Sequence, residues 1–227
     1  MTTLPSSPPA PVAAKQPKRI EAQGDIRIDD YFWLRDRENP AVRSYLEAEN
    51  GYTAAVMGHT QALQATLFQE MRGRIQERDA SVPEQIGDYF YYHRYEEGKQ
   101  YPIYCRKQGS LDNTEEILLD QNAVAAGHDF CHLGIYQISP NHRLLAYSVD
   151  YEGNERFVLR IKDLATGEIL PDAIPDTFYS VEWAADNRTL FYNKQDAAWR
   201  PYKVFRHQLG DDPNQDVLVM HEPDDAY

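Results

Sequence analysis

The chain has 227 residues and a formal net charge of −13, with 16 Tyr, 8 Phe, 3 Trp and 2 Cys. This length accommodates one large domain or two small ones. The acidic balance argues against nucleic-acid binding, which needs clustered Lys and Arg, and no run of about 18 apolar residues is present to cross a membrane. Two cysteines, Cys105 and Cys131, are too few for a disulfide framework, so we predict reduced thiols in a cytoplasmic protein.

Residues 1–19 carry five prolines and no apolar core of the kind that a secretory signal contains. We therefore predict a flexible, proline-rich leader over 1–19. The acidic surface that follows also suits cationic substrates, although charge alone supports that only weakly.

We predict a helical segment over residues 20–78. Asn39 can cap a helix that starts at Pro40, because proline lacks only an N–H that has no helical partner there. A second helix follows Thr60, and its apolar side chains recur at i, i+4. The members of this stripe are Leu63, Leu67, Met71 and Ile75. Such a stripe must be buried against another surface.

From residue 79 onward the apolar period is that of strands, and the sequence repeats itself. Ile138 to Leu164 align without a gap to Trp183 to Leu209 at an offset of 45 residues, and a weaker copy lies upstream. Repeats of this length with short strands and turns are typical of β-propeller blades. We predict blades at about 79–122, 135–172 and 178–221, with separate strands at 168–170 and 180–183. Asp224-Asp225-Ala226-Tyr227 then begins a fourth blade.

No catalytic or metal-binding motif is present in these 227 residues. None of the eight serines lies in Gly-x-Ser-x-Gly, and there is no His-Glu-x-x-His or phosphate-binding glycine loop. His128 and His132 have the i, i+4 spacing of helical metal ligands, but they lie between blades, where loops are expected. The pairs Glu96-Glu97 and Asp224-Asp225 are interpreted as solvated turn residues. We therefore predict no cofactor, no metal and no catalytic residue in this chain.

The segment from Gly24 to Asp36, which contains Tyr31-Phe32-Trp33-Leu34, resembles the N-terminal signature of oligopeptidase B. This is the branch of the prolyl oligopeptidase family of serine peptidases that cleaves after basic residues. The similarity continues through Tyr45 to Asn50, Ile138 to Asn141 and Lys203 to Gly210. These segments follow one another in the family's order from about Pro17 to the end.

The resemblance implies a seven-bladed propeller between a short N-terminal segment and a C-terminal α/β-hydrolase domain. Residues 20–78 would belong to the peptidase domain and pack on that absent hydrolase domain, and 79–227 would be a partial propeller that restricts entry to short peptides. The family's Ser, Asp and His triad would follow Tyr227. The full-length enzyme would act on short basic peptides, and this chain alone would be inactive.

The resemblance also implies a role for the loop Asp150 to Arg156, which joins two strands of the second predicted blade. In the family the matching loop faces the hydrolase domain and carries a charged residue. Glu155 is therefore the candidate for an interdomain ion pair, and a plain solvated turn carboxylate is the alternative.

The sequence is also compatible with two alternative functions. One is a stand-alone propeller that binds a partner without catalysis. The other is a prolyl-specific relative, because the residues that would decide specificity are absent from this chain.

Overall fold

The structure is a computed structural model that describes residues 8–224 and 226. It divides into two compact units, Met1–Gln76 and Glu77–Tyr227. Residues 1–7 of the predicted leader, and Asp225 and Tyr227 of the predicted fourth blade, lie outside the described residues. None of the helices in the described part of the chain has the length and apolar character needed to cross a bilayer.

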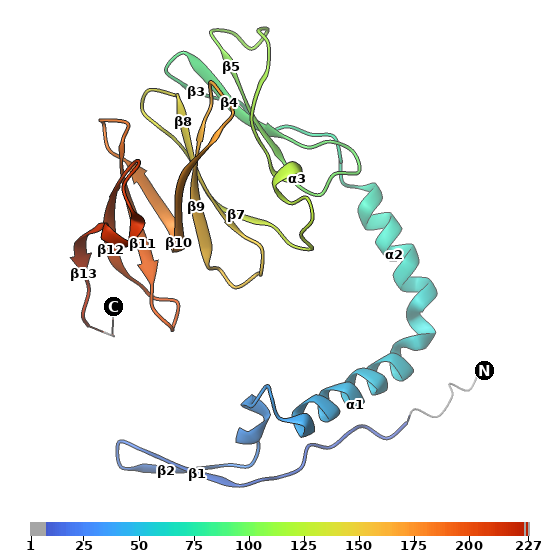
Figure 1. The fold of residues 1–227 in the computed structure, drawn as a ribbon. Helices are drawn as coiled ribbons and strands as arrows, with labels where there is room; N and C mark the ends of the chain where they lie inside the picture. The colour runs from blue at the N-terminus through green and yellow to red at the C-terminus, as the bar shows by residue number, and fades with distance from the viewer. Residues whose placement is uncertain (1–7, 225, 227) are drawn as a thin grey trace. The chain divides into compact units, whose positions relative to one another are not determined.

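The described part of the first unit consists of a hairpin and a series of helices (Figure 1). In chain order these are β1 (Lys18–Ala22), β2 (Asp25–Asp29), η1 (Phe32–Arg35), α1 (Pro40–Met57), η2 (Gly58–Thr60) and α2 (Gln61–Gly73). β1 begins inside the segment 1–19, so the prediction of a flexible leader is wrong for its C-terminal end. Trp33 Nε1 also donates a 2.9 Å hydrogen bond to the carbonyl of Ala14, which orders the chain ahead of β1.

The capping prediction for α1 is confirmed. The side chain of Asn39 accepts a 3.0 Å hydrogen bond from the backbone N–H of Ala41, and Pro40 is the first helical residue. The apolar stripe of α2 is exposed, at 58 % for Leu63, 45 % for Leu67 and 59 % for Met71. Ile75 was predicted to extend this stripe, but α2 ends at Gly73.

The second unit contains two antiparallel sheets (Figure 1). The four-stranded sheet has β3 (Glu84–Ile86), β4 (Tyr89–Arg94), β5 (Ile103–Gln108) and β6 (Glu116–Asp120), followed by the short helix α3 (Gln121–Val124). The seven-stranded sheet has β7 (His132–Ile138), β8 (Leu144–Asp150), β9 (Phe157–Asp163), β10 (Ile169–Trp183), β11 (Thr189–Gln195), β12 (Pro201–Gln208) and β13 (Val217–His221), with η3 (Pro213–Gln215) before β13. Each strand pairs with its sequence neighbour within its sheet. The prediction of a mainly β chain with an N-terminal helical segment is confirmed.

β10 corrects the prediction of two separate strands at 168–170 and 180–183. It is one 15-residue strand whose first half pairs with β9 and whose second half pairs with β11. Thr177 stands in both registers, opposite Phe157 on one side and Lys194 on the other. Asp176, just before it, has a left-handed φ of 58°. The chain therefore passes from one predicted blade to the next by a bend in a continuous strand.

The internal repeat at an offset of 45 residues is confirmed by the backbone. His142 and Asn187 occupy equivalent positions in two turns and have left-handed φ values of 61° and 60°. The N–H of Leu164 donates to the carbonyl of Arg143 at 2.9 Å, and the equivalent bond joins Leu209 to Arg188, also at 2.9 Å. The two turns thus share their conformation as well as their sequence.

The core of the second unit lies on both faces of β8, where Leu145 to Asp150 are all buried. Because successive strand residues point to opposite faces, Leu145, Tyr147 and Val149 join one apolar cluster, while Ala146 joins another with Leu159 and Ile161. Each fully buried aliphatic or aromatic side chain stabilises the fold by about 1.5–3 kcal/mol. This burial holds β8 and β9 rigidly, and the loop between them carries the candidate site.

Candidate functional site: the Glu155 loop

The loop between β8 and β9 is shaped by the carboxylate of Asp150. This side chain is only 2 % exposed. Its Oδ1 accepts hydrogen bonds from the backbone N–H groups of Glu152 at 2.7 Å and Gly153 at 3.0 Å, and its Oδ2 accepts one from Glu155 at 2.8 Å. Hydrogen bonds to an ionised acceptor are stronger than neutral ones. A single buried carboxylate therefore fixes three backbone positions of the loop.

Glu155 lies at the end of this loop with a left-handed φ of 59° and an exposed side chain. Its backbone carbonyl accepts a 2.9 Å hydrogen bond from Nε2 of the buried Gln195 on β11. Its Oε1 accepts a 3.4 Å bond from the hydroxyl of Tyr179 on β10. Burial, and secondarily the Glu155 carboxylate, raise the pKa of Tyr179, so this hydroxyl stays a donor at neutral pH. The backbone of Glu155 is held and its carboxylate faces solvent.

Two further left-handed residues contact the same loop. Trp199, with a φ of 62°, donates from its indole Nε1 to the carbonyl of Asn154 at 2.8 Å. Asp176, with a φ of 58°, forms a 3.4 Å ion pair with Arg156, whose guanidinium lies 5.4 Å from the Trp199 ring. Non-glycine residues in this conformation cost energy and persist where the surroundings hold them, which is typical of binding surfaces. We call Asn154 to Arg156, Asp176, Tyr179, Gln195 and Trp199 the loop cluster.

The loop cluster presents a carboxylate for a cation. The partners of Glu155 are neutral, since they are the Tyr179 hydroxyl and the Gln195 amide. The cluster's one base, Arg156, is paired with Asp176. An added cation would pair with Glu155 without displacing an existing ion pair. The cluster holds no serine, cysteine or histidine, so it can bind and orient but supplies no nucleophile of these types.

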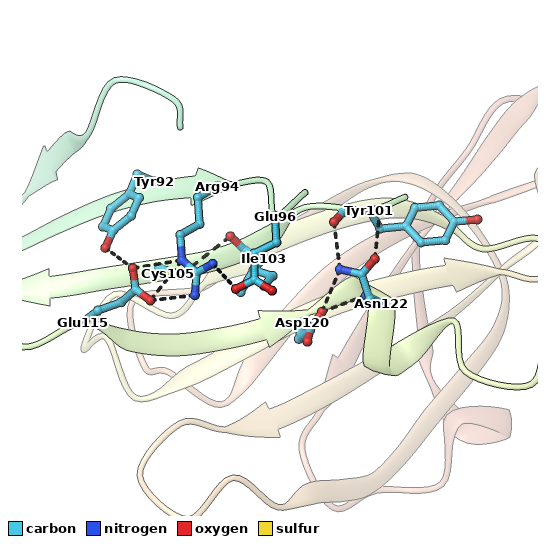
Figure 2. A network of polar contacts seen from close by, with 9 residues as sticks. All are labelled: Tyr92, Arg94, Glu96, Tyr101, Ile103, Cys105, Glu115, Asp120 and Asn122. Carbon is cyan, nitrogen blue, oxygen red and sulfur yellow. Dashed lines mark hydrogen bonds and ion pairs between the residues drawn. The ribbon is translucent and has the colours of Figure 1, made fainter. Parts of the chain in front are cut away.

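A second polar network lies in the four-stranded sheet (Figure 2). The guanidinium of Arg94 forms ion pairs with Glu115 at 3.0 Å and with Glu96 at 2.6 Å, and the Tyr92 hydroxyl donates to Glu115 at 2.5 Å. Burial alone would raise the pKa of Glu115, but hydrogen bonds from Arg94 and Tyr92 outweigh it and hold that pKa below its usual value. Glu96 is therefore an ion-pair partner, and its interpretation as a merely solvated turn residue is wrong.

Beneath Arg94 lies Cys105, which is fully buried. Burial raises the pKa of its thiol to about 12, with the Glu115 carboxylate adding to the effect. Burial likewise raises the pKa of Cys131. Because the thiolate is the reactive form, both cysteines are inert at neutral pH.

The two sheets meet at Arg106 and His142. Arg106 Nη1 donates to the His142 carbonyl at 2.6 Å, and the Tyr91 hydroxyl hydrogen-bonds His142 Nδ1 at 2.7 Å. A pocket of about 300 Å³ adjoins this contact, between β3, β4, β7 and the turn at 139–142. Its walls come from both sheets, among them Ile86 and Tyr136.

The histidines considered as metal ligands lie in aromatic contacts. The His128 ring stacks on Tyr151 with centroids 3.8 Å apart, and His132 packs edge-on against Phe157 at 5.4 Å. The segment between them is a loop up to the start of β7, not a helix. Over residues 8–224 and 226, no cluster of three or more His, Cys, Asp or Glu side chains has the arrangement of a metal site.

Comparison with known proteins identifies the family to which this architecture belongs. The family model for the prolyl oligopeptidase N-terminal β-propeller domain matches residues 11–227. The chain belongs to the prolyl oligopeptidase family. The resemblance found at Gly24 to Asp36 is thereby confirmed at the level of the whole chain.

Relatives within the prolyl oligopeptidase family extend well beyond the length of this chain. Protease 2 of Moraxella lacunata is 38% identical over 96% of this chain and 32% of that protein. Dipeptidyl aminopeptidase BI of Pseudoxanthomonas mexicana is 38% identical over 100% of this chain and 34% of that protein. The structure of oligopeptidase B from Leishmania major matches with a TM-score of 0.86 and 32% identity, over 96% of this chain and 33% of that one. The chain spans about a third of the length of each.

The family resemblance singled out Glu155 but not the residues that position it. Gln195 lies 40 residues from Glu155, and Trp199 lies 45 residues from its partner Asn154. Both reach the loop only because β8 to β12 pair in order. One signal was available in the sequence. An aspartate that ends an apolar strand and precedes Glu-Gly-Asn is placed to accept hydrogen bonds from the turn that follows.

Proposed function

We propose that this chain is the N-terminal part of a serine endopeptidase of the oligopeptidase B type, which hydrolyses short peptides after Lys or Arg. The observation that carries the proposal is the 32% identity to oligopeptidase B of Leishmania major over 96% of the chain, joined to a TM-score of 0.86. The triad would lie in an α/β-hydrolase domain that follows Tyr227. The chain's partners would then be that domain and short basic peptides, in the cytoplasm.

In this proposal the β-sheet unit limits access to the active site. Short peptides would pass it and folded proteins would not. The helices α1 and α2 would bury the exposed stripe of Leu63, Leu67 and Met71 against the hydrolase domain. An exposed apolar stripe of this kind is typical of a surface that another domain covers.

A substrate panel tests the proposal on the full-length protein. Blocked chromogenic peptides that end in Arg or Lys should be cleaved, and a serine-directed inhibitor should abolish the activity. Cleavage only after Pro would instead support the prolyl-specific branch. Absence of all hydrolysis would support a binding module.

A second candidate activity is release of dipeptides from a free N-terminus. It is favoured by one relative, named dipeptidyl aminopeptidase BI, which is as similar to this chain as Protease 2 is, at 38%. An unblocked dipeptide substrate belongs in the same panel. Efficient cleavage of that substrate together with failure on blocked Arg peptides would move the proposal to this activity.

We further propose that Glu155 forms an ion pair with a basic side chain of the hydrolase domain. Its carboxylate is exposed, its backbone is held in place, and its present partners are neutral. Such a pair at a surface is worth about 0–1 kcal/mol, and more when closure of two domains removes its water.

Glu155→Gln should therefore change kcat/KM of the full-length protein several-fold, and the difference from wild type should shrink as salt is raised. Glu168→Gln is the matched control, because Glu168 is an exposed carboxylate in the turn at the other end of β9. Identical kinetics and salt profiles for wild type and Glu155→Gln would leave Glu155 as a plain turn residue.

A further inference from the structure

A buried histidine lies between two buried carboxylates in the seven-stranded sheet. His207 on β12 has no solvent exposure, and the side chains of Asp172 and Asp216 are each 3% exposed. His207 Nε2 lies 2.9 Å from Asp172 Oδ1, and its Nδ1 lies 2.7 Å from Asp216 Oδ1. Both ring nitrogens thus face an acceptor.

The remaining contacts of the two carboxylates come from neutral donors. Asp172 also accepts a 2.7 Å hydrogen bond from the backbone N–H of Gly210, and Asp216 accepts a 2.7 Å bond from the Tyr192 hydroxyl on β11. A neutral imidazole has one N–H, so one of its nitrogens would turn a lone pair toward a carboxylate. An imidazolium has two N–H groups and satisfies both. With both carboxylates ionised, the geometry therefore favours the protonated form of His207.

The same contacts join parts of the sheet that strand pairing leaves apart. Asp172 lies in the first half of β10, which pairs with β9, while His207 and Asp216 lie on β12 and just before β13. β13 is the last strand of the sheet and pairs only with β12 among the described strands. Its side chains are exposed, with Leu218 at 47 %. Backbone pairing with β12 alone holds this edge weakly. The contacts of His207 with Asp172 and Asp216 attach it to the rest of the sheet a second time.

We propose that protonated His207 is a latch that fastens the β12–β13 edge to the first half of β10, and that loss of its proton at alkaline pH releases that edge. Release would free the backbone of β13 and loosen the contact between the β12–β13 edge and the first half of β10. The latch is independent of catalysis and does not rest on the proposed peptidase activity.

The direction of the pH effect follows from the surroundings of His207. Burial alone would lower the pKa of His207, but hydrogen bonds and charge from Asp172 and Asp216 outweigh it, and the pKa is raised above its ordinary 6.5. The titratable groups that face it are Asp172 from β10, Asp216 from the segment before β13, and Tyr192 from β11 by way of Asp216. A raised pKa adds stability that is fully present below the unfolded pKa and is lost as pH rises through the folded pKa.

Hydrogen exchange of the intact protein between pH 6 and 9 tests the latch, with protection expressed relative to intrinsic exchange. Protection of the β12–β13 amides should fall by up to about tenfold per pH unit above pH 6.5, until the pH reaches the pKa of His207 in the folded protein. The amides between β8 and β9 serve as the internal reference and should not show this extra fall. A profile for β12–β13 parallel to that reference would overturn the proposal.

Asp216→Asn is the decisive variant, because it allows a neutral network. Its amide can donate to His207 Nδ1 while its oxygen accepts from Tyr192, and His207 Nε2–H still donates to Asp172. This variant should keep the β13 edge protected and lose the pH dependence.

His207→Gln should lower β12–β13 protection about 100-fold at pH 6, because a buried carboxylate loses its cation. His221→Gln, an exposed residue of β13, should behave as wild type. An unchanged pH profile in Asp216→Asn would refute the latch.

Discussion

Asp150→Asn should destabilise the loop at residues 150–156, lowering the free energy needed to open it locally by about 2–3 kcal/mol. The asparagine oxygen can still accept from Glu152 and Gly153. Its amide nitrogen, however, would face the N–H of Glu155, where the native Oδ2 accepts a 2.8 Å hydrogen bond. Two donors would then meet in a site that is 2 % exposed. The left-handed conformation of Glu155 loses its main constraint, so the candidate interdomain residue loses its position.

Hydrogen exchange read by mass spectrometry on peptides that cover 148–158 measures this effect. Asp211→Asn is the matched control, because Asp211 is an exposed carboxylate whose side chain has no described hydrogen bond. The variant should also weaken the kinetic effect of Glu155→Gln, since the two residues act through one loop. Loop protection equal to wild type in Asp150→Asn would show that Asp150 does not shape the loop.

Arg106→Ala should destabilise the contact between the two sheets by about 3 kcal/mol, the lower end of the range for a broken buried ion pair. Arg106 is 6% exposed and forms a two-point ion pair with Glu116 at 2.8 and 2.9 Å. Its guanidinium lies 4.3 Å from the centre of the Tyr89 ring and donates to the His142 carbonyl. Because the Glu116 side chain is 43% exposed, it keeps part of its hydration when the arginine is removed.

Urea unfolding followed by hydrogen exchange of residues 103–108 and 138–144 measures the loss at the contact. Arg106→Lys should recover less than half of it, because an ammonium cannot reproduce the planar two-point geometry. Arg143→Ala removes an exposed arginine next to His142 and should change stability by less than about 0.5 kcal/mol. Equal stabilities for Arg106→Ala and Arg143→Ala would contradict the role of Arg106 as the link between sheets.

Local patterns in the sequence predicted what depends on local interactions. The helix start at Asn39 and Pro40 and the apolar stripe of α2 follow from signals within a few residues, and the matching turns at His142 and Asn187 follow from the 45-residue repeat. The leader was predicted to be flexible from its prolines. Its end is ordered instead by pairing with β2 and by Trp33, which lies 19 residues from its partner Ala14.

Long-range contacts explain most of what the sequence could not predict. Separate strands were predicted at 168–170 and 180–183, but Asp176 takes a left-handed conformation that bends β10 without ending it. The partners of His207 lie 35 and 9 residues away, so the segment Lys203 to Gly210 could be matched to a family without showing why its histidine matters. Glu155 was identified through family resemblance, whereas the contacts that hold it are visible only in the structure.

We propose that this chain is the non-catalytic N-terminal part of a serine peptidase. The most direct test is to label the full-length protein with a fluorophosphonate, which reacts with an activated serine, and to locate the label by peptide mapping. We expect a single labelled serine outside residues 1–227, with labelling that is blocked by a competing Arg-containing peptide. A labelled serine within residues 1–227, or no labelled serine anywhere in a folded protein, would contradict it.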